Sequence, residues 1–220
     1  MQQRLAIVTG TAKESFLTAL DSTFNRLRST AQTAESNSVH YTASWGPREV
    51  LAHIALWAIQ ASENFQRDLP PLSYSRGHWG SDQARTFDLA FATLGGPTMR
   101  RDDAIRIGWD AVQAAGITLP LLGDETPEQH ASVDDAFNAA AVDLVRGRTF
   151  SDVLELTRRS HENLWGLLQR RPAREYAPGH QLHDRVRLII AHHNEHSAEL
   201  ERMLATVASP PSPTTRELPP

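Results

Sequence analysis

The sequence contains no cysteine, a single lysine (Lys13) and no long hydrophobic run. Without cysteine the chain forms no disulfide, iron–sulfur cluster or zinc ribbon, so thiol chemistry here needs a thiol from outside. No stretch approaches the roughly 20 apolar residues of a membrane span, and no membrane association is expected. The apolar run from Met1 to Ala6 is too short for a signal peptide, which makes the cytoplasm the expected location.

An excess of positive charge is also missing. The net charge is -4, whereas proteins that bind nucleic acid normally present a basic surface, so no nucleic-acid partner is expected. A chain of 220 residues has room for one domain with a real core. We expect a single domain over residues 1–207, followed by a disordered tail over 208–220 that holds five prolines.

Apolar residues recur at helical spacing, and no alternating strand pattern accompanies them. The second helix has a sharp start: Gly46 can cap it, Pro47 suits the first helical position, and the charge of Glu49 favours the first turn. Four main helices predict an all-α fold, a four-helix bundle of the up-and-down type. Their expected ranges are about 3–29, 47–69, 134–170 in two pieces that meet between 146 and 152, and 182–207.

A long segment of weak pattern, about 72–131, forms an insertion between the second and third helices. Only a short helix at about 102–115 is expected in it, and such long segments are often lids or binding loops. Its aromatic residues must pack on something, so we expect the segment to cover the site. The alternative is packing on the outer face of the bundle or a homodimer interface. These aromatics are Tyr74, Trp79, Phe87, Phe91 and Trp109.

Three histidines carry the candidate chemistry. His192 and His196 are four residues apart, so on a helix they lie one turn apart on the same side and can reach one metal ion. His53 lies between Val50 and Trp57 at spacings of three and four residues, which places it on the apolar face of its helix. Three neutral imidazoles with an open position are a typical catalytic metal arrangement.

Two alternatives stay open on the pattern alone. A histidine on an apolar face is most often a core residue bonded to its neighbours, although several buried imidazoles without a shared partner are costly to desolvate. His193 also competes with His192, because both flank the apolar stripe of the last helix and periodicity slightly favours His193. A ligand pair of His193 and His196 is thus the alternative to His192 and His196.

Two motifs match other enzyme classes only in part. The run from Ile7 to Gly10 is similar to the start of a short-chain dehydrogenase, but the remaining glycines of a dinucleotide loop are missing. His192, Glu195 and His196 fit the inverted zincin motif, but that class needs a further acidic ligand far downstream and few residues remain. We therefore set both classes aside. The other histidines singled out, which we expect at the surface, are His78, His130, His180 and His183.

Three stretches resemble the DinB-like (DNA-damage-inducible) four-helix bundle superfamily. The stretch from Trp45 to Trp57, which reads WGPREVLAHIALW, resembles the second helix of that family. The last bundle helix is matched by His192-x-x-x-His196 followed by SAEL, and the third helix by the stretch from Phe137-Asn138 to Leu168. The resemblance covers about two thirds of the chain, and the motifs agree in order and spacing. The 72–131 insertion has no counterpart in the short family members.

The resemblance implies a ligand set and a range of activities. Carried over position by position, the family's metal ligands are His53, His192 and His196, which favours His192 over His193 and implies zinc, nickel or a similar divalent ion. Family members include S-transferases and isomerases that use mycothiol, bacillithiol or glutathione, and hydrolases that disarm reactive natural products. A bound ion can generate a nucleophile near neutral pH, so no cysteine is needed.

We therefore expect a metal-dependent enzyme that acts on a small electrophilic molecule by hydrolysis or thiol transfer, with a low-molecular-weight thiol as co-substrate in the second case. The competing class is a protein that binds or sequesters a natural product without turning it over. A general base beside the metal favours catalysis, and an apolar pocket favours binding. The residues expected at the pocket, besides the metal ligands, are Trp57, Trp79, Trp109, Asn138, His193 and Glu195.

Overall fold

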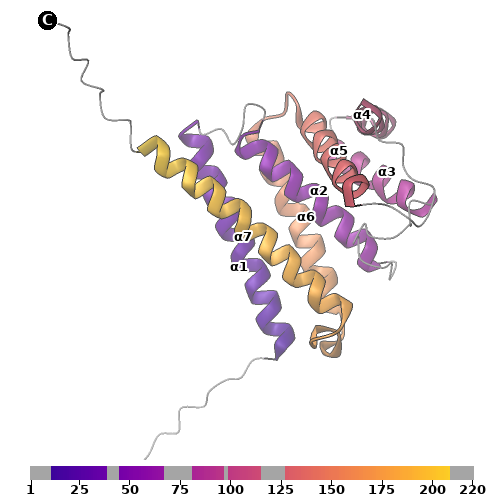
Figure 1. The fold of residues 1–220 in the computed structure, drawn as a ribbon, viewed down its shortest axis with the longest axis vertical. Coiled ribbons are helices and arrows are strands. Elements are labelled where there is room, and N and C mark those ends of the chain that lie inside the picture. The colour runs from indigo at the N-terminus through magenta and orange to yellow at the C-terminus, as the bar shows by residue number, and fades with distance from the viewer. Residues whose placement is uncertain (1–10, 39–44, 67–80, 97–98, 115–126, 209–220) are drawn as a thin grey trace, which may run out of the picture.

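The computed structural model describes residues 11–38, 45–66, 81–96, 99–114 and 127–208 (Figure 1). Over these ranges the chain forms seven α-helices and one short 3-10 helix, Ala173–Tyr176, and no strand. The all-α class expected from the sequence is confirmed. None of the described helices is long and apolar enough to cross a membrane. The proline-rich tail expected after the last helix lies outside the described residues.

The first and last helices pack side by side. Helix α1, Ala12–Ser36, starts where Thr11 and Glu14 form a capping box. It runs seven residues beyond the end expected from the sequence, because Ala31 and Ala34 continue its buried stripe. Helix α7, Gln181–Ala208, lies along it, and Arg26 of α1 forms an exposed ion pair with Glu201 of α7 at 2.7 Å.

The second pair consists of α2, Pro47–Gln66, and α6, Phe150–Arg170. The start of α2 agrees with its sequence signals, since the backbone N–H of Gly46 donates to the Glu49 carboxylate at 2.8 Å. The Thr157 hydroxyl of α6 donates to the Leu51 carbonyl of α2 at 3.0 Å. Helix α2 is buried on almost every side, which places it at the centre of the fold.

Helix directions differ from a simple up-and-down order. Contacts at both ends show that α6 runs parallel to α2, because Arg48 bonds to the Arg148 carbonyl and Arg171 bonds to the Phe65 carbonyl. Helices α1 and α7 are likewise parallel to one another and run opposite to α2 and α6 (Figure 1). Parallel neighbours need long connections, and the chain between α2 and α6 supplies one.

Three further helices occupy that connection: α3, Ser81–Gly95, α4, Arg101–Ala114, and α5, Pro127–Val145. The sequence pattern predicts α4 but does not predict α3, and it places the start of α5 seven residues too late. The buried residues Phe87, Ala90, Phe91 and Leu94 of α3 do follow helical spacing. The glycines at 95 and 96 obscure that signal, since they end the helix directly after its stripe.

The aromatic residues of this region extend the main core on the side of α2. Phe87 and Phe91 lie with their rings 6.0 Å apart, and both contact Phe137 of α5 and Trp109 of α4. Gly108 lets α4 approach closely, because a Cβ there would lie 2.5 Å from the Phe91 ring. As expected, Phe87, Phe91 and Trp109 are packed, and they pack largely on one another.

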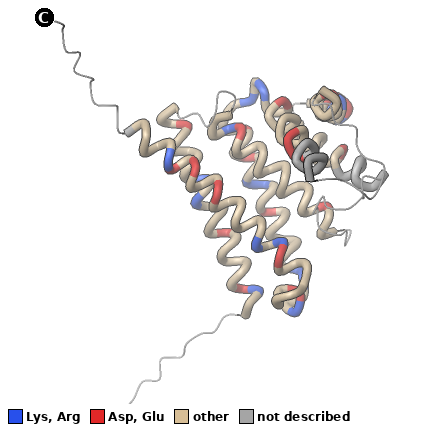
Figure 2. Tube along the Cα trace, in the orientation of Figure 1, with Lys and Arg blue, Asp and Glu red and all other residues tan. Residues whose placement is uncertain are grey.

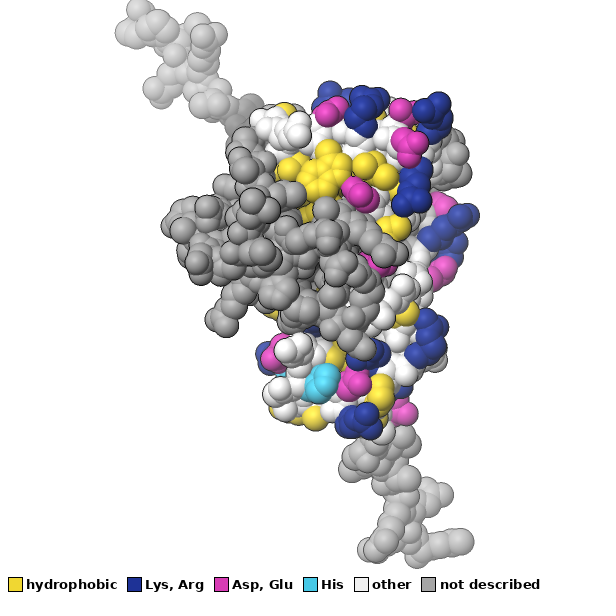
Figure 3. Space-filling view, turned by 90° about the vertical axis from the view of Figure 1, so that its right-hand side faces the viewer, with side chains coloured by type: hydrophobic (Ala, Val, Ile, Leu, Met, Phe, Trp, Pro, Cys, Tyr) yellow, Lys and Arg dark blue, Asp and Glu magenta, His cyan; other side chains and the backbone are white. Residues whose placement is uncertain are grey.

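The surface shows no strong segregation of charge. Among the described residues, acidic and basic side chains are interspersed along the helices (Figure 2). On the face that carries α4, a small group of hydrophobic side chains lies among charged ones (Figure 3). Neither feature singles out a functional surface, so the interior of the fold is the place where a site can be built.

Candidate metal centre

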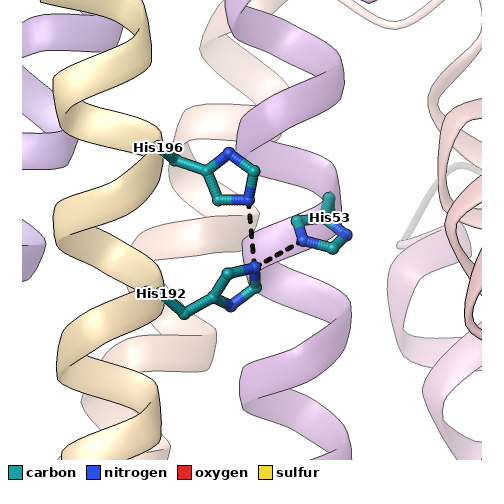
Figure 4. A group of neighbouring side chains, drawn as sticks. All are labelled: His53, His192 and His196. Carbon is teal, nitrogen blue, oxygen red and sulfur yellow. Dashed lines mark hydrogen bonds between the residues drawn. The ribbon is translucent and has the colours of Figure 1, made fainter.

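Helices α2 and α7 bring three imidazoles to one point (Figure 4). The Nε2 atom of His192 lies 2.8 Å from Nε2 of His53 and 3.0 Å from Nε2 of His196. One ring nitrogen of each residue lies within 4.8 Å of the other two. His53 is 5% exposed, and the two histidines of α7 are half-buried at the edge of a cavity.

The partners of His53 fix which of its nitrogens carries the proton. Its Nδ1 lies 2.7 Å from the Oδ1 of Asn138 on α5, and the indole Nε1 of Trp57 lies 3.3 Å from the same oxygen. An indole N–H only donates, so Oδ1 accepts from both groups. Nδ1 of His53 therefore carries the proton, and its Nε2 presents a lone pair to the other two rings. The Trp57 indole nitrogen also lies 3.1 Å from Nδ1 of His53, but a protonated Nδ1 cannot accept its hydrogen, so the indole donates to Asn138.

A carboxylate lies beside the outer nitrogen of His196. Its Nδ1 is 3.3 Å from Oε2 of Glu199, one turn further along α7. The negative charge favours a proton on Nδ1, which leaves the lone pair of Nε2 for the other two rings. Histidines that bind metals commonly donate their second N–H to a carboxylate or carbonyl group, and Asn138 accepts that bond from His53.

Burial keeps the three rings neutral. It lowers the pKa of His53 well below the usual 6.5, and the neighbouring His192 and His196 lower it further. Burial also lowers the pKa of His192 to about 3 and lowers the pKa of His196. At neutral pH the rings are therefore uncharged, which is the form of histidine that binds metal ions.

This donor set fits a divalent cation. With the Nδ1 protons of His53 and His196 engaged elsewhere, at most one proton is left among the three converging nitrogens, and it can serve only one of the two short contacts well. A cation accepts all three lone pairs at once. Zinc–nitrogen bonds of about 2.0–2.1 Å in a tetrahedron separate ligand nitrogens by about 3.3 Å, so small side-chain shifts suffice.

A cavity of about 690 Å³ opens beside the triad, between α2, α5 and α7. Its volume falls in the usual range for small-molecule sites, and its wall is mostly apolar with a few polar groups. Of the residues expected at the pocket, Trp57, Asn138 and Glu195 line it. A second cavity of about 460 Å³, between α2, α3 and α6, contains no histidine.

Sequence reasoning overlooked several residues of the cavity. Trp45 lies with its ring 5.5 Å from the ring of His53, and Arg185 lies at the far end of the wall with its guanidinium 5.1 Å from the Phe65 ring. Helical spacing offered a signal for Arg185, since it precedes His192 by seven residues and so shares its face of α7. Asp134 and Leu188 are also part of the lining.

His193 lies on a different side of α7 and does not line the cavity. It is 3% exposed, its Nδ1 is 3.4 Å from the Thr23 hydroxyl of α1, and its ring lies 5.9 Å from the ring of Phe24. His161 stacks on Phe24, with the two rings 3.8 Å apart, and its ring lies 6.2 Å from that of His193. The periodicity that favours His193 reflects burial against α1, whereas the spacing of His192 points it to His53.

Of the two tryptophans that the sequence predicts over the site, the structure describes only Trp109, and it lies elsewhere. Trp109 packs on Phe87 and Phe91, its indole N–H donates to Asp88 at 2.6 Å, and it does not line the cavity. Trp79 lies outside the described residues. The cavity is lined instead by Asp134 and Asn138 of α5, which follow the predicted insertion in the sequence.

The chemistry open to the site follows from these side chains. Three neutral, converging imidazoles can hold one divalent cation and leave a coordination position for another molecule. The carboxylate of Glu195 lies on the cavity wall one residue before a ligand and can take up a proton. No family model, no curated protein and no solved structure matches the chain.

Proposed function

We propose that the chain is a metal-dependent enzyme of the DinB-like kind, which acts on a small electrophilic molecule by hydrolysis or thiol transfer. In this proposal α1, α2, α6 and α7 are the four bundle helices, and α3, α4 and the start of α5 are the insertion. Two observations support it. Helix α1 packs on α7 and α2 packs on α6. His53 of α2 also lies beside His192 and His196 of α7. Metal sites of helical bundles are built between facing helices in this way.

The observation that carries the proposal is the convergence of three neutral imidazoles, one of which is oriented by Asn138 while another lies beside the Glu199 carboxylate. A divalent ion such as zinc or nickel would supply Lewis acidity there and lower the pKa of a water or thiol that binds to it. His53, His192 and His196 would hold the ion. The cavity beside them would admit the substrate, and mycothiol or a similar thiol where one is used.

Glu195 has the position of a proton acceptor. It lines the cavity between the two α7 ligands in sequence, and its carboxylate is exposed enough to exchange protons with solvent. Trp45 and Trp57 would give the substrate apolar surface to pack on beside His53. The chain has no cysteine, so in thiol transfer the attacking sulfur belongs to the co-substrate.

Metal analysis of the purified protein tests the core of the proposal. We expect one zinc or nickel ion per chain in the wild type and loss of the ion in His192→Ala. The same preparations are then assayed for conjugation of mycothiol or glutathione to a reactive chloro-compound and for hydrolysis of an activated ester. A wild-type protein that purifies without metal and takes up none from added zinc or nickel contradicts the proposal.

The apolar lining of the cavity favours a second candidate, a protein that sequesters a ligand without turning it over. Apolar residues dominate the part of the wall away from the histidines, including Ala61, Phe65, Leu188 and Ile189. The Glu195→Gln variant separates the two candidates. An enzyme should lose at least about tenfold in kcat while it keeps its metal, whereas a binding protein shows no turnover in either form.

A further inference from the structure

The cavity extends well beyond the histidine triad. It follows the line between α2 and α7, which are antiparallel, from His53 and His192 to Phe65 and Arg185. Arg185 precedes His192 by seven residues, so it lies two helical turns, or about 10 Å, further along α7. The cavity thus has a metal-binding end and a distal end that are separated by the length of a small extended molecule.

The distal end offers hydrogen-bond donors in an apolar wall. Arg185 is only 8% exposed, and its guanidinium lies over the face of the Phe65 ring. Asn64, beside Phe65, is 2% exposed, and its Nδ2 has no acceptor among the described residues. A guanidinium cannot be deprotonated in a protein, so this end of the cavity holds a permanent positive charge in a site of low polarity.

The lining also contains two acidic residues, Glu195 and Asp134. Glu195 belongs to the metal-binding end and is exposed, so water and salt screen it. Asp134 is half-buried on α5. A divalent ion on the triad together with Arg185 gives three positive charges against these two negative ones, and the cavity as a whole favours an anion.

We propose that the molecule bound in this cavity carries a carboxylate, which Arg185 and Asn64 hold at the distal end while the reactive group lies at the triad. The proposal rests on the function proposed above and adds the substrate class: an elongated small acid with about 10 Å between its two ends. The middle of the molecule is apolar, because Ala61, Leu188 and Ile189 line the cavity between the ends. Arginine suits this task because its planar fork binds a carboxylate through two hydrogen bonds.

Two chelating probes of matched length test the proposal in the zinc-loaded protein. Suberic acid monohydroxamate has a metal-binding head and a carboxylate tail, and octanohydroxamic acid has the same head and a methyl tail. We expect the carboxylate-tailed probe to bind the wild type at least about tenfold more tightly than the other probe, the advantage usual for a charge-assisted hydrogen bond. Arg185→Gln should remove this advantage, while its affinity for octanohydroxamic acid stays within about twofold.

Arg187→Gln is the matched control, because Arg187 is two positions away on the same turn of α7 and is exposed. It loses the same charge and should keep the preference for the carboxylate tail. If Arg185→Gln fails to fold, Arg185→Lys decides: it keeps the charge, loses the planar fork and should bind the carboxylate-tailed probe several-fold less tightly than the wild type. Equal affinity of the two probes for the wild type overturns the proposal.

A metal-free arm distinguishes this failure from failure of the metal site. Octanoate is titrated into protein stripped with a chelator, where its carboxylate has no ion to bind. We expect octanoate to bind Arg185→Gln about tenfold less tightly than the wild type and Arg187→Gln unchanged. If no variant binds zinc but this pattern holds, the metal proposal fails and the carboxylate site stands. If octanoate binds Arg185→Gln as well as the wild type, the carboxylate site falls.

Discussion

The side-chain oxygen of Asn138 on α5 lies 2.7 Å from Nδ1 of His53 on α2. This bond joins α5 to the triad, and it sets the tautomer that turns Nε2 of His53 toward His192. Trp57 donates to the same oxygen, which fixes the amide in the orientation that His53 requires. Asn138 is therefore a positioning residue for the proposed metal site.

Asn138→Ala should weaken metal binding by about 10- to 100-fold, because the other partners of a metal ligand orient the ring and raise its basicity. Competition with a chelator of known zinc affinity measures the change. Asn138→Asp keeps the acceptor oxygen and should bind zinc at least as well as Asn138→Ala does. Asn163→Ala, at an exposed position of α6, is the control. Unchanged zinc affinity in Asn138→Ala contradicts the assignment.

The two adjacent histidines of α7 should respond differently to removal. His192→Ala should abolish stoichiometric zinc binding, because its Nε2 contacts both other ligands. His193→Ala should keep one zinc per chain but lower the free energy of unfolding by about 1–3 kcal/mol, since it leaves a gap beside Phe24 and removes the contact of the buried ring with the Thr23 hydroxyl. Zinc stoichiometry and urea unfolding of both variants test this. Loss of zinc only in His193→Ala would reverse the ligand assignment.

The sequence predicts the triad because helical spacing alone decides which residues share a face. His192 and His196 are one turn apart wherever their helix packs, and His53 belongs to the apolar stripe of α2. Spacing does not show which neighbour covers a face, however. It therefore leaves His192 and His193 as competitors, and only the packing of α1 against one side of α7 separates them.

The region between α2 and α6 was harder to predict for the same reason. Its aromatics had to be buried, but the sequence could not show that Phe87, Phe91 and Trp109 pack on one another rather than on the metal site. The closeness of α3 and α4 depends on the missing side chain of Gly108, whereas glycine in a sequence is normally a sign of a break. Arg185 was overlooked because a charged residue is expected at the surface, yet here it is buried.

Two glycine substitutions test the packing of α4 on α3. Gly108→Ala should lower the free energy of unfolding by about 1–3 kcal/mol, because the new Cβ would lie 2.5 Å from the Phe91 ring and the helices must move apart. Gly166→Ala is the matched change in α6, where a Cβ meets only the Arg170 side chain at 3.8 Å. It should stabilise the helix by about 0.5–1 kcal/mol. Urea denaturation gives both values, and a shift of the same sign in both variants contradicts the packing.

The buried histidines also predict how the metal-free protein responds to acid. In the unfolded chain a histidine takes up a proton below its usual pKa of 6.5, whereas burial lowers the pKa of His192 and of His193 to about 3 in the folded protein and lowers the pKa of His161 as well. Between these values the unfolded state holds more protons, so stability rises with pH and is lost as the pH falls from 6.5 toward about 3.

The window from pH 6.5 down to about 5 isolates this effect, because unfolded carboxyl groups are still mostly ionised there. In the presence of a chelator, the urea midpoint should fall steadily across this window. The His161→Gln, His193→Gln double variant should show a shallower fall, even if it is less stable at neutral pH, because two of the neutral buried rings no longer titrate in the unfolded state. A wild-type midpoint that stays level from pH 6.5 to about 5 would mean that these rings are not held neutral by burial.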